Sequence, residues 1–130
     1  LSLEMGLDMN HPAGRAMLDQ ARFALVIASC MADLAAPVDG VFPSLEDEAR
    51  LQDTAEHARA AGMGGMMCVH PRQINVVNEA FATSETELEW ASAVLAAAVT
   101  EKSSFRFRGQ MVDKPVLERA HSFLSSSTST

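Results

Sequence analysis

Apolar and polar positions follow two periods along this chain, one typical of strands and the other typical of helices. Strands are predicted at 1–5, 38–42 and 66–69, where apolar residues alternate with polar ones or form a short apolar run. Between these segments apolar residues recur at spacings of three and four, which predicts helices. The expected helices span residues 12–36, 44–61, 72–81, 84–102 and 115–124, and a short ribbon is expected at 105–108.

Several residues that commonly begin or end helices stand at these boundaries. Ser84 is followed three residues later by Glu87, which is the signature of a capping box, and Ser44 with Asp47 forms a similar pattern. Gly62 stands where the second helix should end, as glycine often does. The glycines at 62, 64 and 65 could also suggest a phosphate-binding loop. Such a loop follows a strand and opens a helix, whereas these glycines follow a helix, so we favour a helix terminator.

Strands separated by single helices indicate an α/β protein with a parallel sheet and right-handed crossovers. Three main strands are too few for a complete (β/α)8 barrel of about 250 residues, and the pattern fits the C-terminal part of a TIM barrel with a C-terminal helical extension. The chain begins in mid-pattern without an initiator methionine, so we expect residues upstream of Leu1. The expected organisation is a partial barrel at 1–104, a ribbon and helix extension at 105–124, and a disordered tail at 125–130.

Composition narrows the classes of protein to which the chain can belong. Its 130 residues carry a net charge of -7, which argues against binding to nucleic acid or to an anionic membrane surface. No apolar run reaches the roughly 18 residues of a membrane span. Cys30 and Cys68 lie far apart and form no CxxC pair, so we expect reduced thiols and a cytoplasmic location.

The first candidate site lies at the end of the third predicted strand, in the segment His70-Pro71-Arg72-Gln73. Ligands bind at the carboxyl ends of strands in α/β proteins, so His70 is a candidate pocket residue. A structural histidine is the alternative. A zinc site would need more ligands at suitable spacing than the nearby Cys68, so we do not favour zinc.

Three acidic residues are further candidates, each with a simpler structural interpretation. Asp113 stands just before Lys114-Pro115, where it can cap a helix, or it can serve as a general acid or base. Met111 and Val112 would then provide an apolar setting that raises its pKa. Glu4 and Asp8 lie near the end of the first predicted strand. Carboxylates there can bind Mg2+, or they can be ordinary surface acids.

Taken together, several segments resemble one protein family. They are Cys68-Val-His-Pro-Arg-Gln-Ile74, Val76-Val-Asn-Glu-Ala-Phe81, the stretch from Ser84 through Trp90-Ala91, and Gly109-Gln-Met-Val-Asp-Lys-Pro115. In this order and at these spacings they resemble the C-terminal part of the citrate lyase beta-subunit-like (CitE-like) proteins of the HpcH/HpaI aldolase superfamily. The match runs from about residue 17 to residue 124 and is strongest from Val38 onward.

The resemblance implies a TIM barrel with a C-terminal extension, usually assembled as trimers. It also implies Mg2+-dependent cleavage of a carbon–carbon bond in a 3-hydroxyacyl-CoA thioester of the citryl-, malyl- or citramalyl-CoA type. The cleavage is of the retro-Claisen type and passes through an acetyl-CoA enolate. Two other functions stay open: a non-catalytic binding or regulatory subunit of the same fold, and a CoA-thioester hydrolase.

The resemblance also assigns roles to individual residues. Asp113 matches the aspartate of a Met-Val-Asp-x-Pro segment, which acts as acid or base in the site of a neighbouring subunit. Val69, His70 and Pro71 match a strand end that lies near the CoA. Aligning Asp8 with an aspartate after the family's Gly-x-Glu-Asp segment puts Glu4 at the metal position. A second metal carboxylate and a substrate-binding arginine belong to upstream strands that these 130 residues do not include.

Overall fold

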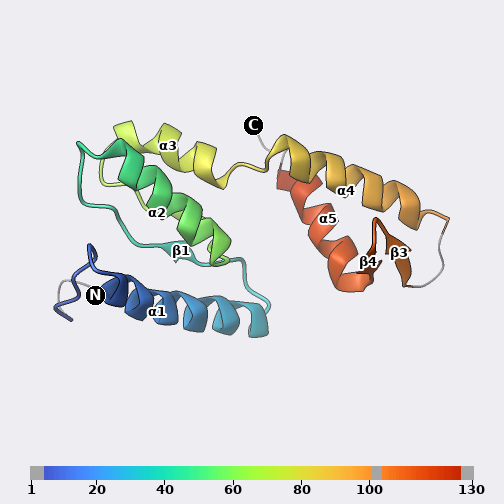
Figure 1. Ribbon diagram of the computed structural model, residues 1–130, viewed down its shortest axis with the longest axis horizontal. Coiled ribbons are helices and arrows are strands. Elements are labelled where there is room, and N and C mark those ends of the chain that lie inside the picture. Colours follow the sequence, from blue (N-terminus) through green and yellow to red (C-terminus); the bar gives the residue numbers. More distant parts are fainter. Residues whose placement is uncertain (1–4, 101–103, 127–130) are drawn as a thin grey trace. The chain divides into compact units, whose positions relative to one another are not determined.

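The computed structural model describes residues 5–100 and 104–126, and the chain divides into two compact units, Leu1–Phe81 and Ala82–Thr130 (Figure 1). The predicted boundary between barrel and extension at residue 104 stays a prediction. The first unit contains, in order, α1 (Pro12–Met31), β1 (Val38–Asp39), α2 (Glu48–Ala60), β2 (Gly65–Met66) and α3 (Arg72–Phe81). The second contains α4 (Glu85–Ala98), β3 (Phe105–Phe107), β4 (Gln110–Val112) and α5 (Lys114–Ser126).

The first unit is built around the two parallel strands β1 and β2. Val38 pairs with Gly65, and Asp39 with Met66. The pairing continues one residue further, where the Met67 N–H donates to the Asp39 carbonyl at 3.1 Å. The predicted parallel pairing across a helix is therefore confirmed, although both strands are shorter than expected. The first predicted strand lies almost entirely outside the described residues.

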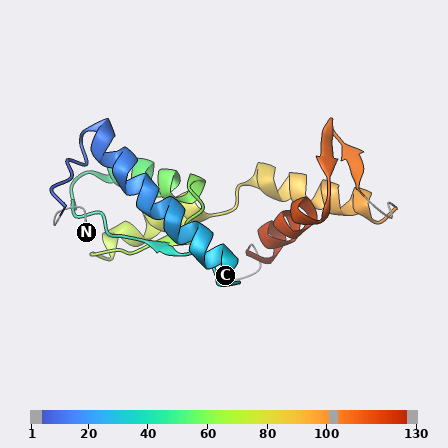
Figure 2. The ribbon, with the colours of Figure 1, turned by 90° about the horizontal axis from the view of Figure 1, so that it is seen from below.

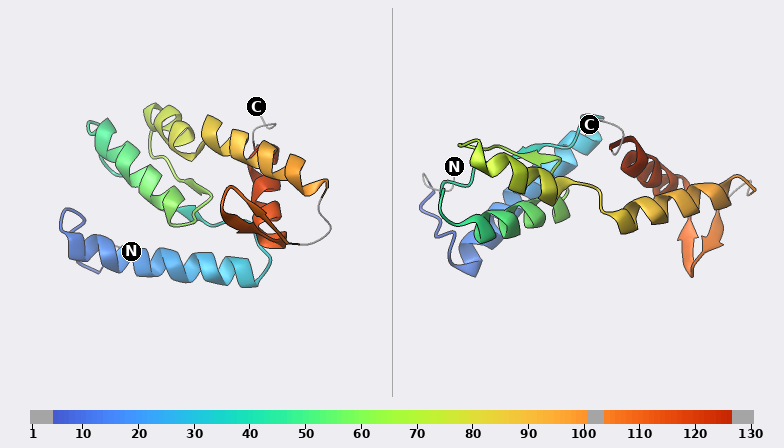
Figure 3. Two further views of the ribbon diagram at one scale, coloured as in Figure 1. Left: turned by 45° about the vertical axis from the view of Figure 1, so that its right-hand side comes forward. Right: turned by 90° about the horizontal axis from the view of Figure 1, so that it is seen from above.

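The core of the first unit joins α2 and α3 to the strands. Leu51 and Ala55 of α2 and Val77 of α3 are buried with Phe42 and Met66, and Cys68, Val76 and Phe81 pack against this cluster. Figures 1 and 3 show α2 and α3 side by side. Burial of this apolar surface is the main favourable contribution to folding here, at roughly 25 cal/mol per Å2.

Helix α1 does not bury the apolar residues that recur along it at helical spacing. Met17, Ile27 and Met31 are exposed, whereas Gly14 and Arg22 are the buried positions of this helix. The predicted end near residue 36 is wrong, because the helix ends at Met31. Apolar residues occur on more than one side of α1, so periodicity alone did not identify the packed face.

The boundaries of α2 correct one prediction and confirm another. The helix is capped by Asp47, whose side chain accepts a hydrogen bond from the Arg50 N–H, and not by Ser44 as predicted. Asp47 accepts the N3 amide three residues into the helix, which is the usual capping geometry. The predicted end is confirmed: Gly62 has a φ of +94°, a left-handed conformation that favours glycine.

The second unit is a pair of helices and a β-hairpin. Strands β3 and β4 are antiparallel and are joined by Arg108 and Gly109, both with positive φ, as in the tight turns of two-residue hairpins. Figure 2 shows the hairpin standing out from the α4–α5 pair. The buried core of the second unit consists of Ala91, Val94, Val112 and Ala120. The capping box predicted at Ser84 is confirmed.

Helix α5 extends to Ser126, beyond the predicted end at Leu124, so the first two residues of the expected disordered tail are helical. The rest of that tail lies outside the described residues, as do residues 101–103 at the predicted end of the fourth helix. Within the described ranges, no helix combines the length and the apolar character that crossing a membrane requires.

Candidate functional site

The ends of the two parallel strands are tied together by one buried side chain, that of Gln73 in the first turn of α3. Its Nε2 donates to the Phe42 carbonyl at 2.9 Å and to the Ser44 carbonyl at 3.2 Å, both in the segment between β1 and α2. Its Oε1 accepts from the Val69 N–H at 2.9 Å, in the segment between β2 and α3. A single amide therefore holds the two βα segments against each other.

His70, a site residue predicted from the sequence, is half-buried beside this amide. Its Nδ1 accepts a hydrogen bond from the Arg72 N–H at 3.1 Å, and its carbonyl accepts from the Gln73 N–H at 3.0 Å. With Nδ1 as an acceptor, the neutral ring carries its proton on Nε2. The adjoining Val69 and Pro71 are exposed. The three predicted pocket residues thus form one turn with a defined imidazole orientation.

A cavity of about 250 Å3 lies where α2 and α3 begin. Three of its lining residues are acidic, and Arg72 is the basic one. Because this lining is negative overall, the cavity does not favour a phosphate-rich ligand. Its lining consists of Ser44, Leu45, Glu46, Asp47, Glu48, Leu51, Arg72, Gln73 and Val76.

Sequence patterns did not reveal a charged network that joins α1, β1 and α2. Arg22 is buried and pairs with the buried Asp39 at 2.6 Å and with Asp19 at 2.9 Å, and Asp19 also contacts Nε2 of His57 at 2.8 Å. Burial by itself raises the pKa of the Asp19 carboxyl, but hydrogen bonds from His57 and Arg22 outweigh it, so that this pKa is lowered. Burial likewise opposes the charge of Arg22, yet its hydrogen bonds to Asp39 and Asp19 raise its pKa.

Asp113 lies in the second unit, between β4 and α5. Its Oδ1 accepts a hydrogen bond from the Val116 N–H at 3.3 Å, the contact of a helix N-cap. The side chain is exposed, and the expected apolar setting is not formed in this chain, because Met111 is also exposed and Val112 is buried in the core. The cap occupies one carboxylate oxygen, which leaves Oδ2 for other chemistry.

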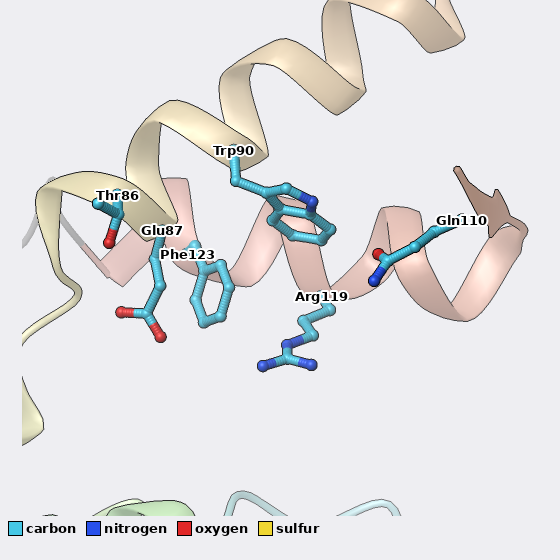
Figure 4. A pocket seen from close by; sticks show the side chains of 6 residues that line it. All are labelled: Thr86, Glu87, Trp90, Gln110, Arg119 and Phe123. Carbon is cyan, nitrogen blue, oxygen red and sulfur yellow. The ribbon is translucent and has the colours of Figure 1, made fainter. Parts of the chain in front are cut away.

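A second cavity, of about 210 Å3, lies between α4 and α5 (Figure 4). The rings of Trp90 and Phe123 meet edge to face with centroids 6.1 Å apart, and the Arg119 guanidinium lies 5.3 Å from the Phe123 centroid. Figure 4 shows the Glu87 carboxylate and the Arg119 guanidinium projecting from the two helices on the same side. None of the site residues predicted from the sequence lines this cavity.

The predicted magnesium ligand Glu4 lies outside the described residues. Asp8 is exposed, and its Oδ1 accepts from the Asn10 N–H at 2.8 Å within a turn. Among residues 5–100 and 104–126, no three His, Cys, Asp or Glu side chains are grouped so that they could hold a metal ion. The described residues therefore do not fit a magnesium ion by themselves.

Comparison with known proteins identifies relatives of this chain. No family model matches it. A citrate lyase subunit beta-like protein of Mycobacterium tuberculosis (strain H37Rv) is 43% identical over 100 residues, which cover 77% of this chain and 36% of that protein. A protein of the same description from Deinococcus radiodurans is 36% identical over 118 residues, covering 88% of this chain and 41% of that one. The chain is a homologue of the citrate lyase beta-like (CitE) family.

The fold agrees with this relationship. The structure of CitE from M. tuberculosis in complex with magnesium, acetoacetate and coenzyme A superposes with a TM-score of 0.75 at 35% identity, over 91% of this chain and 42% of that one. Mitochondrial citramalyl-CoA lyase of Mus musculus is 34% identical over 96 residues, covering 71% of this chain and 28% of the enzyme. The chain thus spans less than half the length of these CitE relatives, and it is a mixed α/β structure that matches part of their fold.

Proposed function

We propose that the CitE homologue described here contributes to a carbon–carbon lyase acting on a 3-hydroxyacyl-CoA thioester of the citryl-, malyl- or citramalyl-CoA type. The observation that carries the proposal is the 35% identity and shared fold with a CitE structure that holds magnesium, acetoacetate and coenzyme A. The relationship to mitochondrial citramalyl-CoA lyase supports the same reaction class. We also propose that the whole protein forms a complete TIM barrel.

In the proposed reaction, Asp113 is the acid or base. Cleavage moves the electrons of the carbon–carbon bond into a thioester enolate, while the 3-hydroxyl loses its proton and becomes a carbonyl. We propose that the Asp113 carboxylate accepts the 3-hydroxyl proton and then donates it to the enolate carbon, which regenerates the carboxylate. The N-cap contact through Oδ1 holds this side chain at the start of α5, so that Oδ2 is the oxygen proposed to transfer the proton.

The turn of Val69, His70 and Pro71 is proposed as a wall of the CoA pocket. The exposed Val69 provides apolar surface, and Nε2–H of the neutral His70 ring provides a hydrogen-bond donor. The acidic cavity at the starts of α2 and α3 does not favour the phosphates of CoA. We therefore propose that the thioester binds at the turn of Val69, His70 and Pro71, and that the acidic cavity is not part of the CoA site.

Magnesium, when bound, would polarise a substrate oxygen as a Lewis acid. We propose Glu4 as one of its ligands, with the remaining ligands supplied by residues outside the described part of the chain. Assembly as a trimer, with Asp113 serving a neighbouring subunit, is a further part of the proposal. The cysteines described, Cys30 and Cys68, are both free, which supports the proposed cytoplasmic location.

The substitution Asp113→Asn in the whole protein tests the catalytic assignment. Asparagine also caps helices well, so the start of α5 should be preserved while the proton-transfer group is lost. We expect cleavage to fall by about 100-fold or more, in line with the usual contribution of a general acid or base, with an unchanged thermal unfolding curve. Asp47→Asn, which alters the exposed aspartate cap of α2, is the matched control and should keep full activity. Normal turnover by Asp113→Asn would contradict the assignment.

Two further measurements separate this function from the other two. A lyase releases a carbonyl fragment together with an acyl-CoA, whereas a thioester hydrolase releases free CoA, so identification of the products distinguishes the reactions. Calorimetric titration of the whole protein with Mg2+ distinguishes the lyase from a non-catalytic subunit. Absence of magnesium binding would favour the non-catalytic role.

A further inference from the structure

The Gln73 side chain uses both amide protons and its carbonyl oxygen on backbone groups of other segments. Its residue is only 3% exposed, and every buried side-chain polar atom in the described part of the chain has a partner. The contacts reach 31 and 29 residues back to Phe42 and Ser44, and four residues back to Val69. A buried amide with this many long-range backbone partners fixes the backbone at both ends.

The turn that contains His70 is closed by two more contacts. The Gln73 N–H donates to the His70 carbonyl, and the Arg72 N–H donates to Nδ1 of the His70 ring. The Val69 N–H points to the Gln73 side chain instead of a neighbouring strand. The direction in which Val69 and His70 present their side chains therefore depends on Gln73.

We infer that Gln73 is a positioning residue for CoA-thioester binding. It holds the Val69–His70–Pro71 turn at a fixed place against the segment that follows β1, and so fixes the wall that the thioester meets. This inference rests on the proposed function, and it adds a residue with no direct contact to substrate. Because Gln73 acts through the turn that is proposed to bind the thioester, and the proton transfer is assigned to Asp113, loss of Gln73 should weaken binding and spare the chemical step.

Two substitutions remove different parts of this arrangement. Gln73→Glu keeps the size of the side chain and its acceptor for the Val69 N–H, but places a carboxylate against the carbonyls of Phe42 and Ser44. Gln73→Met keeps the length and removes all three hydrogen bonds. The control is Gln52→Met, since Gln52 is an exposed helical glutamine whose amide contacts a surface side chain, Glu56, at 2.9 Å.

The test measures steady-state cleavage by the whole protein, with whichever of citryl-CoA, malyl-CoA and citramalyl-CoA the wild type cleaves. We expect KM to rise about tenfold in both Gln73 variants, because the Val69–His70–Pro71 turn is no longer held in the position that binds the thioester, while kcat stays within about twofold. Gln52→Met should match the wild type. In nitrogen NMR spectra, His70 should show one tautomer, with Nδ1 unprotonated, in the wild type and a mixture of tautomers in Gln73→Met.

An unchanged KM in folded Gln73 variants would overturn this inference and leave the lyase function standing. A fall in kcat at constant KM would also overturn it, because Gln73 would then act on the chemical step. Unfolding of both variants, checked by thermal denaturation, would make Gln73 a stability residue and reject the positioning role. A wild type that cleaves none of the three thioesters would overturn the proposed function, and this inference with it.

Discussion

Arg22 of α1 donates two hydrogen bonds to a single oxygen of Asp39 in β1, from Nη2 at 2.6 Å and from Nε at 3.0 Å. Both side chains are almost completely shielded from water. Two charges removed from water are tolerated only where they are paired and hydrogen-bonded, so each depends on the other. The Arg22–Asp39 pair therefore attaches α1 to β1 through charged side chains.

Replacement of one partner in this pair should destabilise the protein strongly. Arg22→Met leaves the Asp39 carboxylate buried without a counter-charge, and we expect the free energy of unfolding to fall by about 3–5 kcal/mol. Urea denaturation measures this fall in the free energy of unfolding. Arg15→Met, at an exposed position of the same helix, is the control and should change little. The double variant Arg22→Met with Asp39→Leu should recover much of the loss, and a double variant as unstable as Arg22→Met would contradict this explanation.

The lowered pKa of Asp19 predicts a stability that depends on pH. Burial opposes the shift, but the hydrogen bonds from His57 and Arg22 outweigh it, so the folded pKa lies below the ordinary value of 3.8. The folded protein then binds this proton more weakly than the unfolded chain does. The resulting stability is present above pH 3.8 and is lost as the pH falls through the lowered pKa.

Asp19→Asn should therefore be less stable than the wild type near neutral pH, and the difference should shrink in acid. Urea unfolding of both proteins near neutral pH and at about pH 3 measures this convergence. Asp53→Asn, at an exposed position of α2, is the comparison. A difference between Asp19→Asn and wild type that stays constant across this range would show that charge on Asp19 does not contribute.

The structural and catalytic roles of Asp113 can be separated by the choice of substitution. Asp113→Ala removes the contact with the Val116 N–H, and we expect α5 and the second unit to lose about 1 kcal/mol of stability. Asp113→Asn should keep most of that stability. Chemical denaturation of the two variants gives the comparison, and equal losses in both would contradict the prediction that asparagine preserves the cap.

The capping box at the start of α4 should contribute a similar amount to the free energy of unfolding. The Ser84 side chain accepts from the Glu87 N–H at 3.3 Å, while the Glu87 carboxylate accepts from the Ser84 N–H at 2.8 Å. Ser84→Ala should lower the free energy of unfolding by about 1 kcal/mol, and Ser84→Asp should retain most of it. Differential scanning calorimetry of the two variants measures the effect. A Ser84→Ala variant with wild-type stability would indicate that other contacts hold the helix start.

Local patterns predicted the features that depend on neighbouring residues. The bounds of α3, the capping box at Ser84, the terminator Gly62 and the N-cap contact of Asp113 each follow from residues within about one helical turn. The cap of α2 was assigned to Ser44 instead of Asp47, because two suitable residues stand three positions apart and spacing alone does not choose between them. The His70 turn was located from its motif, but the partner that holds it was not.

The sequence by itself determined the order of the elements from residue 12 onward, the parallel pairing of the two central strands and the resemblance to the CitE family, because periodicity, caps and motifs are local properties. Tertiary structure decided which face of α1 is buried, since the Arg22–Asp39 pair joins residues 17 positions apart. It also decided that Gln73 holds the His70 turn, through contacts with Phe42 and Ser44. Both depend on chain segments brought together by folding. A charged or amide side chain becomes a core residue only where distant partners satisfy its hydrogen bonds, and no local pattern records those partners.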